Sequence, residues 1–298
     1  MSSSHRAGER AAGPDADADA ALAPWRNRWG LEADGAAFST PSSALQPVRQ
    51  HGRAAYLKLA TVAEEAAGGR VLRWWAGRGA AAVLAADGDA LLLERADGDR
   101  DLVALAASGA AGDDAATRIL CRAALRLHAI DDLPRPDGLV DLRRWFRELF
   151  EHAAENPVAH DGLFARAAAE AEALLAHPAG DVVLHGDLHH GNVLDFGTET
   201  GAAGGRGWLA IDPKHLHGDP AFDFANILCN PKREVALAPG RFGRTVRVIA
   251  DETGIDAVRL LRWALAWAGL SAAWSERSGD DAGTAVGVGR LALRAAAR

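Results

Sequence analysis

The sequence predicts an α+β fold in which a small β-rich lobe is followed by a larger helical lobe. Strand patterns with short turns fill residues 45–93, helical periodicity dominates after residue 98, and short apolar strands interrupt the helical part between residues 182 and 211. Such a change in hydrophobic period indicates two differently built parts of one chain. We expect a disordered lead (1–24), an N-terminal lobe (25–95) and a C-terminal lobe (96–298).

The first elements follow from local patterns. The lead is rich in Ala, Asp, Ser and Gly, with too few large apolar groups to pack. A strand is expected over residues 54–59, a helix over 64–76 despite Gly68 and Gly69, and two further strands over 80–86 and 90–94. The last two flank an Asp-Gly-Asp sequence at 87–89, which is a strong signal for a β-hairpin.

The remaining elements are mainly helices. Apolar residues recur at helical spacing in four segments, and three short apolar runs interrupt them. The expected helices are 115–130, 142–152, 163–176 and 257–274, and the expected strands are 182–184, 193–194 and 208–211. The tryptophans at 263, 267 and 274 repeat at helical spacing, which predicts a place in the core rather than a binding platform.

Composition excludes several classes of protein. The 298 residues carry 40 acidic and 33 basic side chains, and this net charge of -7 is a poor balance for a nucleic-acid binder. No apolar stretch approaches the roughly 20 residues of a membrane span, and the N-terminus lacks the apolar core of a secretory signal. The two cysteines form no disulfide framework or metal-binding motif. A cytoplasmic protein is expected.

Residues 184–193, Leu-His-Gly-Asp-Leu-His-His-Gly-Asn-Val, form the most informative segment. Asp187 precedes Asn192 by five positions in a loop between apolar strands, which is the arrangement of a phosphotransferase catalytic loop. The aspartate would take the proton of the acceptor hydroxyl, and the asparagine would bind Mg²⁺. Gly191 would let the backbone turn tightly enough for both side chains to act on one phosphate.

A second carboxylate follows on the next apolar strand. Asp212 ends the run Trp-Leu-Ala-Ile-Asp at 208–212 and is placed to bridge Mg²⁺ to the nucleotide phosphates. The Gly-rich segment 197–207 would form the turn that pairs 193–194 with 209–211. Asp195 begins an Asp-Phe-Gly triplet typical of a kinase metal site, but it lies only three residues after Asn192. We therefore expect Asp195 to point away from the metal and to behave as a surface residue.

Three ordered motifs carry a family resemblance. The segments 185–194, 208–214 and 218–224 resemble the aminoglycoside phosphotransferase family, in particular its streptomycin 6-phosphotransferase and hydroxyurea phosphotransferase branch. The resemblance runs from about residue 45 to the C-terminus. It implies a protein-kinase-like bilobal fold, ATP as co-substrate, Mg²⁺ as cofactor, Asp187 as catalytic base, and Asn192 with Asp212 as metal ligands.

Further roles follow from the resemblance. His185 would brace the catalytic loop and Asp223 would anchor it from the following helix. Lys58 would hold the α- and β-phosphates, paired with an acidic residue of the next helix, for which Glu65 is chosen over its neighbour Glu64. Residues 93–96 would form the hinge that binds adenine through its backbone, with Glu94 and Ala96 as the contacts. Residues 46–52 depart from the family pattern because they do not form a Gly-rich phosphate loop.

The predicted reaction is Mg-dependent transfer of the γ-phosphoryl group of ATP to a small hydroxylated acceptor. A streptomycin-like acceptor would be cationic, and Asp219, Glu276, Asp280 and Asp281 are the candidate acidic residues along its approach. Two alternatives remain open. The histidines at 185, 189 and 190 could bind zinc in a hydrolase. Alternatively, a kinase-like protein could bind nucleotide without turnover.

Overall fold

The computed structural model describes residues 15–197 and 206–297, and these divide into two compact units. The first, here called the sheet unit, comprises residues 15–100 together with 194–215, apart from the segment that is not described. The second, the helical unit, comprises residues 101–193 and 216–297. Each is described by itself.

The sheet unit combines two helices with an antiparallel sheet and a hairpin. Its elements are α1 (Ala16–Trp29), β1 (Glu32–Ala33), β2 (Phe38–Ser39), β3 (Ser43–Gln50), β4 (Arg53–Ala60), α2 (Ala63–Trp75), β5 (Val83–Asp87), β6 (Ala90–Glu94), β9 (Val193–Asp195) and β10 (Trp208–Ala210). The main sheet has the order β1-β3-β4-β6-β5, and β2 also pairs with β3. All its neighbouring strands are antiparallel.

The middle of this sheet is held in register by two tight connections. His51 and Gly52 both have positive φ (50° and 80°) and join β3 to β4, which is the geometry of a two-residue hairpin turn. Residues 46–52, which were not expected to form a Gly-rich phosphate loop, form the end of β3 and this tight turn. The predicted second hairpin, β5–β6, is confirmed around Gly88.

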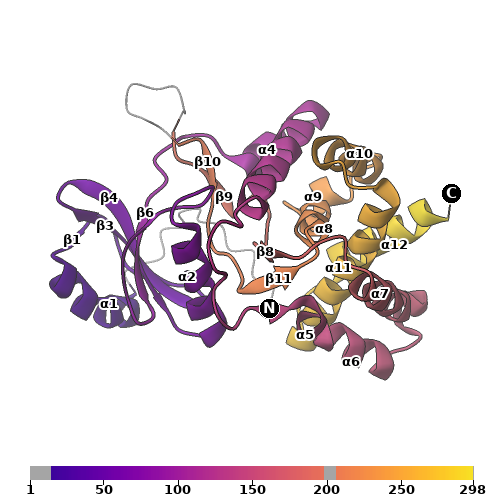
Figure 1. Cartoon of the computed structure of the whole chain (residues 1–298), viewed down its shortest axis with the longest axis horizontal. Coiled ribbons are helices and arrows are strands. Elements are labelled where there is room, and N and C mark those ends of the chain that lie inside the picture. Colours follow the sequence, from indigo (N-terminus) through magenta and orange to yellow (C-terminus); the bar gives the residue numbers. More distant parts are fainter. Residues whose placement is uncertain (1–14, 198–205, 298) are drawn as a thin grey trace. The chain divides into compact units, whose positions relative to one another are not determined.

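The expected disordered lead is wrong from Ala16 onward, because α1 occupies this segment; residues 1–14 lie outside the described chain. The Asp15 carboxylate caps the helix by accepting the backbone N–H groups of Asp17 (3.1 Å) and Ala18 (3.0 Å). The helix packs on β3 and β4 (Figure 1) and buries Ala18 and Leu22. Alanine has the highest helix propensity, so this short apolar face suffices once a sheet covers it.

The helical unit contains most of the chain's helices and a small sheet. Its elements are α3 (Leu102–Ala107), α4 (Ala110–His128), β7 (Val140–Asp141), α5 (Leu142–Trp145), α6 (Arg147–Glu155), α7 (Ala159–Ala176), β8 (Val182–Leu184), β11 (Leu216–Gly218), α8 (Ala221–Ala225), the 3-10 helix η1 (Asn226–Cys229), α9 (Arg233–Ala236), α10 (Arg241–Thr253), α11 (Ala257–Ser278) and α12 (Gly283–Ala296). β11 is the middle strand, parallel to β7 and antiparallel to β8.

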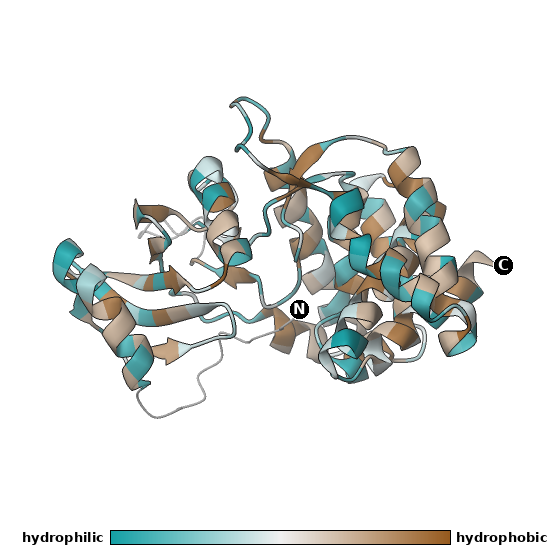
Figure 2. Cartoon of the chain, turned by 90° about the horizontal axis from the view of Figure 1, so that it is seen from below, coloured by the Kyte–Doolittle hydropathy of each residue, from teal (hydrophilic) through white to brown (hydrophobic). Residues whose placement is uncertain are grey.

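Helix α11 forms the centre of this unit, where it packs against α12, α7, α8 and α6 (Figure 1). Trp263 and Trp267 are at most 2% exposed and Trp274 is 8% exposed, so their predicted place in the core is confirmed. Phe222 of α8 packs edge-on against the first two of these rings. In Figure 2 the helices of this unit carry both hydrophobic and hydrophilic colours, as amphipathic helices do.

The division into units departs from the expected boundary at residues 95 and 96. The β9–β10 hairpin, expected in the C-terminal lobe, groups with the sheet unit. The N–H of Ala81 donates to the carbonyl of Ala210 (2.9 Å), and the N–H of Gly98 donates to that of Asp195 (3.0 Å). The predicted pairing of these two strands is confirmed, but β10 ends at Ala210, one residue before the predicted end. The hairpin brings Asp212 into the same unit as Lys58.

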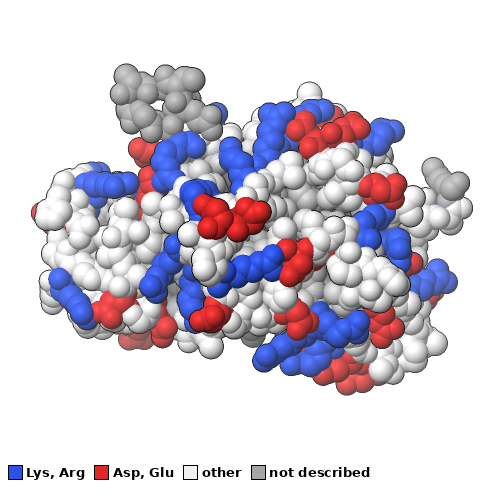
Figure 3. Space-filling model, in the orientation of Figure 1, with Lys and Arg blue, Asp and Glu red and all other residues white. Residues whose placement is uncertain are grey.

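The distribution of charged side chains and the hydropathy of the helices can be compared with what the composition predicted. Lys and Arg are interspersed with Asp and Glu over the face drawn in Figure 3, so this face carries no broad basic patch. Within the described residues, no helix combines the length and apolar character that crossing a membrane requires.

Candidate active site

Lys58 lies between two carboxylates in the sheet unit. It is 6% exposed on β4, the strand between β3 and β6, so an exposed edge position is excluded. Its Nζ donates to Glu65 Oε1 of α2 and to Asp212 Oδ1 (2.6 Å). Burial alone would lower the pKa of Lys58, but the two carboxylates outweigh it and hold the pKa above its ordinary value. The ammonium group therefore stays charged.

The structure distinguishes the two neighbouring glutamates of α2. Glu65 contacts Lys58, whereas Glu64 pairs with Lys214 (3.1 Å). The glycines that follow explain how close α2 comes to the rest of the unit. A Cβ at Gly68 would clash with the carbonyl oxygen of Pro213, and one at Gly69 would lie 2.9 Å from the Leu91 side chain. Both glycines therefore let α2 bring Glu65 to Lys58 despite their low helix propensity.

Asp212 has an unusual backbone. Its φ is +53°, in the left-handed region that few non-glycine residues adopt, and its side chain is 42% exposed. Backbone strain of this kind costs on the order of 1–3 kcal/mol and is retained mainly at functional sites. A cavity of the sheet unit is lined by Lys58, Glu65, Asp212 and Pro213, together with residues of α2. One basic and two acidic groups thus meet at a cavity wall.

Lys58→Arg is expected to raise the nucleotide KM or lower kcat by about tenfold or more. Arginine keeps the charge but replaces a compact ammonium with a wide planar fork that the space between two carboxylates does not fit. Steady-state kinetics with varied ATP measure the effect. The matched control is Lys232→Arg at an exposed position before α9, which should be silent; equal behaviour of the two variants would contradict the assignment.

The loop predicted to be catalytic, residues 185–192, follows β8 in the helical unit. Asp187 is held on both sides by amides: Asn226 Nδ2 donates to its Oδ1 (2.9 Å), and Asn192 Nδ2 donates to its backbone carbonyl (2.9 Å). Asn192 Nδ2 also lies 3.5 Å from Asp187 Oδ2. The Asp187 side chain is 20% exposed and can be reached by a small molecule. Because Asn192 uses its Nδ2 here, its Oδ1 is the atom that can bind a cation.

Asp223 of α8 anchors this loop through hydrogen bonds to its backbone. Its Oδ2 accepts the backbone N–H of His185 (2.9 Å), its Oδ1 accepts that of Gly186 (2.8 Å), and His128 Nε2 lies 2.8 Å from Oδ2. Burial raises the pKa of Asp223, but the hydrogen bond and charge of His128 and the other donors bring it below its ordinary value. His185 is fully buried, and its Nδ1 accepts the N–H of Asp187 (3.3 Å).

Two residues of this arrangement were missed by the sequence reasoning. Asn226 follows Asp223 by three positions in an otherwise apolar run, and a polar residue in such a run is a signal that could have been used. His128 gave no comparable signal, because a basic residue in the last turn of an amphipathic helix is ordinary.

The histidines do not form a zinc site. His189 Nδ1 accepts the N–H of Gly191 (3.0 Å), and His190 is buried, which together with the nearby charge of Arg241 lowers its pKa well below the ordinary value. Within residues 15–197 and 206–297, no group of three or more His, Cys, Asp or Glu side chains could hold a metal ion. Mg²⁺ needs no such cage, since it retains waters and uses one or two carboxylates with substrate phosphates. Asp212 supplies a carboxylate and Asn192 an amide oxygen, and each is an oxygen donor of the kind that Mg²⁺ accepts.

The expected hinge lies beside an apolar cluster. Ala96 packs against the buried side chains of Ala81, Phe196 and Leu209. The N–H of Glu94 donates to the carbonyl of Ala82 (2.9 Å), so this donor is used within the protein. The Glu94 carboxylate pairs with Arg206 and accepts the N–H of Ala82 (3.2 Å). The side chain of Glu94 thus links the end of β6 to Arg206 and to the residue that precedes β5.

The expectation that Asp195 behaves as a surface residue is wrong. It is 4% exposed, and its carboxylate accepts hydrogen bonds from Arg100 Nη2 (2.5 Å) and Nε (2.8 Å) and from the N–H of Gly197 (3.1 Å). A Cβ at Gly98 would clash with the Asp195 side chain. The hydrogen bonds from Arg100 lower the pKa of Asp195 below its ordinary value. Asp195 ties residues 98–100 to the hairpin.

Asp195→Ala is therefore expected to lower the free energy of unfolding by about 2 kcal/mol, the usual range for hydrogen bonds to a charged group. Asp212→Ala should cost less stability, because Lys58 keeps Glu65 as its partner, but it should abolish Mg-dependent turnover. Denaturant unfolding and turnover assays on both variants test this contrast. The assignment of Asp212 would be contradicted if Asp212→Ala lost more stability than Asp195→Ala while Asp195→Ala lost more turnover.

Three of the four acidic residues expected along an acceptor approach pair with other side chains. Asp219 is 2% exposed, accepts the N–H groups of Ala179 (2.8 Å) and Ala221 (2.9 Å), and pairs with Arg259, so it is a buried structural group. Glu276 is bound by His152 (2.9 Å) and His160 (2.6 Å). In the loop after α11, Asp281 is 80% exposed and pairs with Arg233 (3.2 Å), and Asp280 is exposed.

The sequence matches a known family over most of its length. A family model described as aminoglycoside/hydroxyurea antibiotic resistance kinase matches residues 28–279. A streptomycin 3''-kinase of Klebsiella pneumoniae is 49% identical over 252 residues, which cover 83% of this chain and 89% of that protein. A streptomycin 6-kinase of Streptomyces griseus is 34% identical over 282 residues, covering 90% of this chain and 85% of that protein.

The fold also matches solved structures. A thermostable mutant of an aminoglycoside phosphotransferase, solved in ternary complex with ADP and hygromycin B, aligns with a TM-score of 0.61 at 17% identity. The alignment covers 93% of this chain and 98% of that one. At this identity the likeness concerns the fold alone, which is the α+β protein-kinase-like fold that the sequence motifs predicted.

Proposed function

Since the chain belongs to the aminoglycoside/hydroxyurea antibiotic resistance kinase family, we propose that it transfers the γ-phosphoryl group of ATP to a hydroxyl group of a streptomycin-like aminoglycoside. Modification of that hydroxyl would inactivate the antibiotic and give resistance to it. The observation that carries the acceptor class is the high identity to a streptomycin kinase over most of both chains. We place the reaction in the cytoplasm, where ATP is supplied.

The nucleotide would be held by residues of the sheet unit. Lys58 would bind the α- and β-phosphates, with Glu65 fixing its ammonium group in place. Lys58 also donates to Asp212 (2.6 Å); phosphate oxygens would take the place of Asp212 on the lysine and free the carboxylate for a cation. The adenine would lie near the apolar cluster around Ala96, with the backbone of residues 93–96 as its hydrogen-bonding partner and Glu94 keeping this segment closed.

Mg²⁺ would be held by Asp212 and Asn192 and would neutralise charge on the phosphates. These ligands belong to different units, so their joint role is part of the proposal. The protein's remaining work is positioning, since phosphoryl transfer needs little covalent help. Asp187 would accept the proton of the acceptor hydroxyl. The hydroxyl oxygen would then form the bond to the γ-phosphorus as the bond to ADP breaks and ADP leaves. Asp223 would keep the loop rigid by accepting the backbone N–H groups of His185 and Gly186, and His185 by accepting the N–H of Asp187 at its Nδ1.

The proposal is tested by offering acceptors to the purified protein with ATP and Mg²⁺. Streptomycin, hydroxyurea and neutral sugars are compared by ADP release, and NMR of the product identifies the phosphorylated hydroxyl. We expect streptomycin to be phosphorylated and neutral sugars to be inert, with Asp187→Asn as the control for background hydrolysis. Phosphorylation of hydroxyurea or of neutral sugars but not of streptomycin would overturn the acceptor class and leave the kinase chemistry in place.

A further inference from the structure

Asn226 contacts the carboxylate of Asp187 and is itself held in one orientation. It is 4% exposed at the start of η1, and its Nδ2 donates to Asp187 Oδ1 (2.9 Å). Asn230 Nδ2 donates to Asn226 Oδ1 (2.9 Å) and to the Asn226 carbonyl (3.0 Å). An amide has its donor and acceptor on opposite sides, so a donor placed at Oδ1 directs Nδ2 toward Asp187. Asn230 therefore determines that the Nδ2 end of the Asn226 amide faces Asp187.

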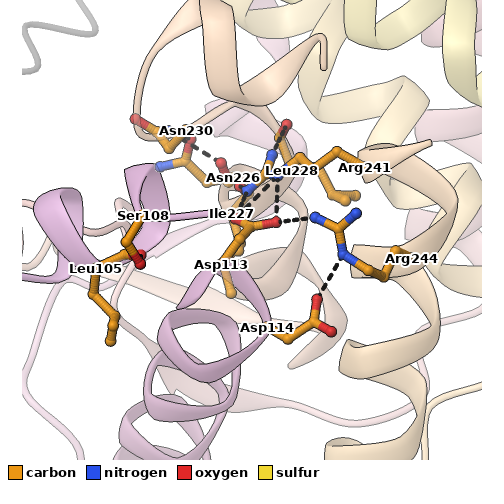
Figure 4. A network of polar contacts seen from close by, with 10 residues as sticks. All are labelled: Leu105, Ser108, Asp113, Asp114, Asn226, Ile227, Leu228, Asn230, Arg241 and Arg244. Atoms are coloured by element: carbon orange, nitrogen blue, oxygen red, sulfur yellow. Dashed lines mark hydrogen bonds and ion pairs between the residues drawn. The ribbon is translucent and has the colours of Figure 1, made fainter. Parts of the chain in front are cut away.

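The backbone that carries Asn226 is held by a buried ion pair (Figure 4). Arg241 of α10 is 1% exposed and donates to the carbonyls of Leu228 (3.0 Å) and Ile227 (3.4 Å), the residues that follow Asn226. The same guanidinium binds both carboxylate oxygens of Asp113 in α4 (3.1 Å each). The carbonyls of η1 are thus bound by a group that cannot move without breaking a buried ion pair.

The two contacts to Asp187 differ in quality. Oδ1 accepts a well-formed hydrogen bond from Asn226, whereas Oδ2 has a 3.5 Å approach from Asn192 Nδ2 and a 3.9 Å approach from His189 Nε2. One strong bond at one oxygen fixes the rotation of the carboxylate and leaves the other oxygen to accept a proton. Displacement of a reacting group by about 1 Å can cost about 100-fold in rate.

We propose that Asn226 is a positioning residue for phosphoryl transfer: it holds Oδ1 of Asp187 so that Oδ2 receives the acceptor's proton, and Asn230 sets its orientation. This inference rests on the proposed function, because it assigns the proton to Asp187. The geometry lies entirely within the helical unit. Neither asparagine belongs to the His-x-Asp-x-x-x-x-Asn motif or to the segment 208–212.

Asn226→Leu, which is similar in volume but donates no hydrogen bond, is expected to lower kcat by about 10–100-fold with both KM values within about threefold. In an Asp187→Asn background the same change should cost less than about twofold, because the carboxylate it positions is absent. Asn230→Ala should lower kcat by a smaller factor and add little to Asn226→Leu. The control is Asn156→Leu, whose amide donates to the His152 carbonyl (3.1 Å) and should leave kcat within about twofold.

A loss from Asn226→Leu that persists in full in the Asp187→Asn background would overturn the inference, because it would show a general structural role. Asn226→Asp keeps the shape and serves if the leucine variant does not fold; the repulsion between carboxylates should lower kcat at least as much. Crystal structures of the wild type and the Asn226 variant provide a readout that needs no acceptor. The Asp187 carboxylate should leave its wild-type rotamer while the loop backbone stays in place; an unchanged rotamer would refute the inference even if streptomycin proves not to be the acceptor.

Discussion

Asp187→Asn is expected to lower kcat by about 10²–10⁴-fold, the usual contribution of a positioned general base. The amide keeps the shape of the carboxylate and can still meet Asn226 and Asn192, but it cannot take the proton of the acceptor hydroxyl. The nucleotide contacts proposed for the sheet unit do not include Asp187, so the KM for ATP should stay within about threefold. Single-turnover measurements with streptomycin separate the chemical step from product release.

A control for the same loop is His189→Gln. His189 Nδ1 accepts only the N–H of Gly191 among the hydrogen bonds described, and its Nε2 lies 3.9 Å from Asp187, too far for a hydrogen bond. This change should therefore cost much less than Asp187→Asn. Turnover of Asp187→Asn near the wild-type rate would refute its role as base, and an equal loss in the two variants would show that the loop conformation, rather than the carboxylate, limits the reaction.

The candidate catalytic residues could be picked out from the sequence because their spacing is local. Asp187 and Asn192 are five residues apart in one loop, and Asp212 lies two residues after β10, so short-range patterns suffice to identify them as candidates. The pairing of Lys58 with Glu65 needed a choice between neighbours. The structure makes that choice through Lys214, which takes Glu64, and through Gly68, which lets the helix approach Pro213.

The residues that hold the site in place could not be predicted from the sequence, because they meet only through tertiary packing. His128 reaches Asp223 from a helix 95 positions earlier in the chain, and Arg241 reaches Asp113 across 128 positions. Asp195 was misjudged for the same reason, since only the fold brings Arg100 to it. Helix α1 was missed because an alanine-rich segment with few large side chains forms a stable helix only when a sheet is present to cover Ala18 and Leu22.

Asp113→Ala is expected to lower the free energy of unfolding by about 3–5 kcal/mol, the cost of leaving a buried charge without its partner. Asp113 is 2% exposed and binds two arginines, Arg241, which is 1% exposed, and Arg244 (2.8 Å). Alanine would leave the Arg241 guanidinium buried with only backbone carbonyls as partners. Because the chain has two units, denaturant unfolding should be followed by hydrogen exchange in α4 and α10 as well as by tryptophan fluorescence.

Two comparisons separate the buried charge from the loss of a side chain. Asp281→Ala removes an 80% exposed carboxylate from its pair with Arg233 and should cost about 0–1 kcal/mol. The double change Asp113→Leu with Arg241→Met removes both charges of the buried pair, leaves Arg244 with Asp114, and should be less destabilising than Asp113→Ala alone. If the double variant is instead the less stable of the two, the pair itself contributes net stability to η1. A loss for Asp113→Ala no larger than for Asp281→Ala would show that the network of Figure 4 is not what holds Asn226 in place.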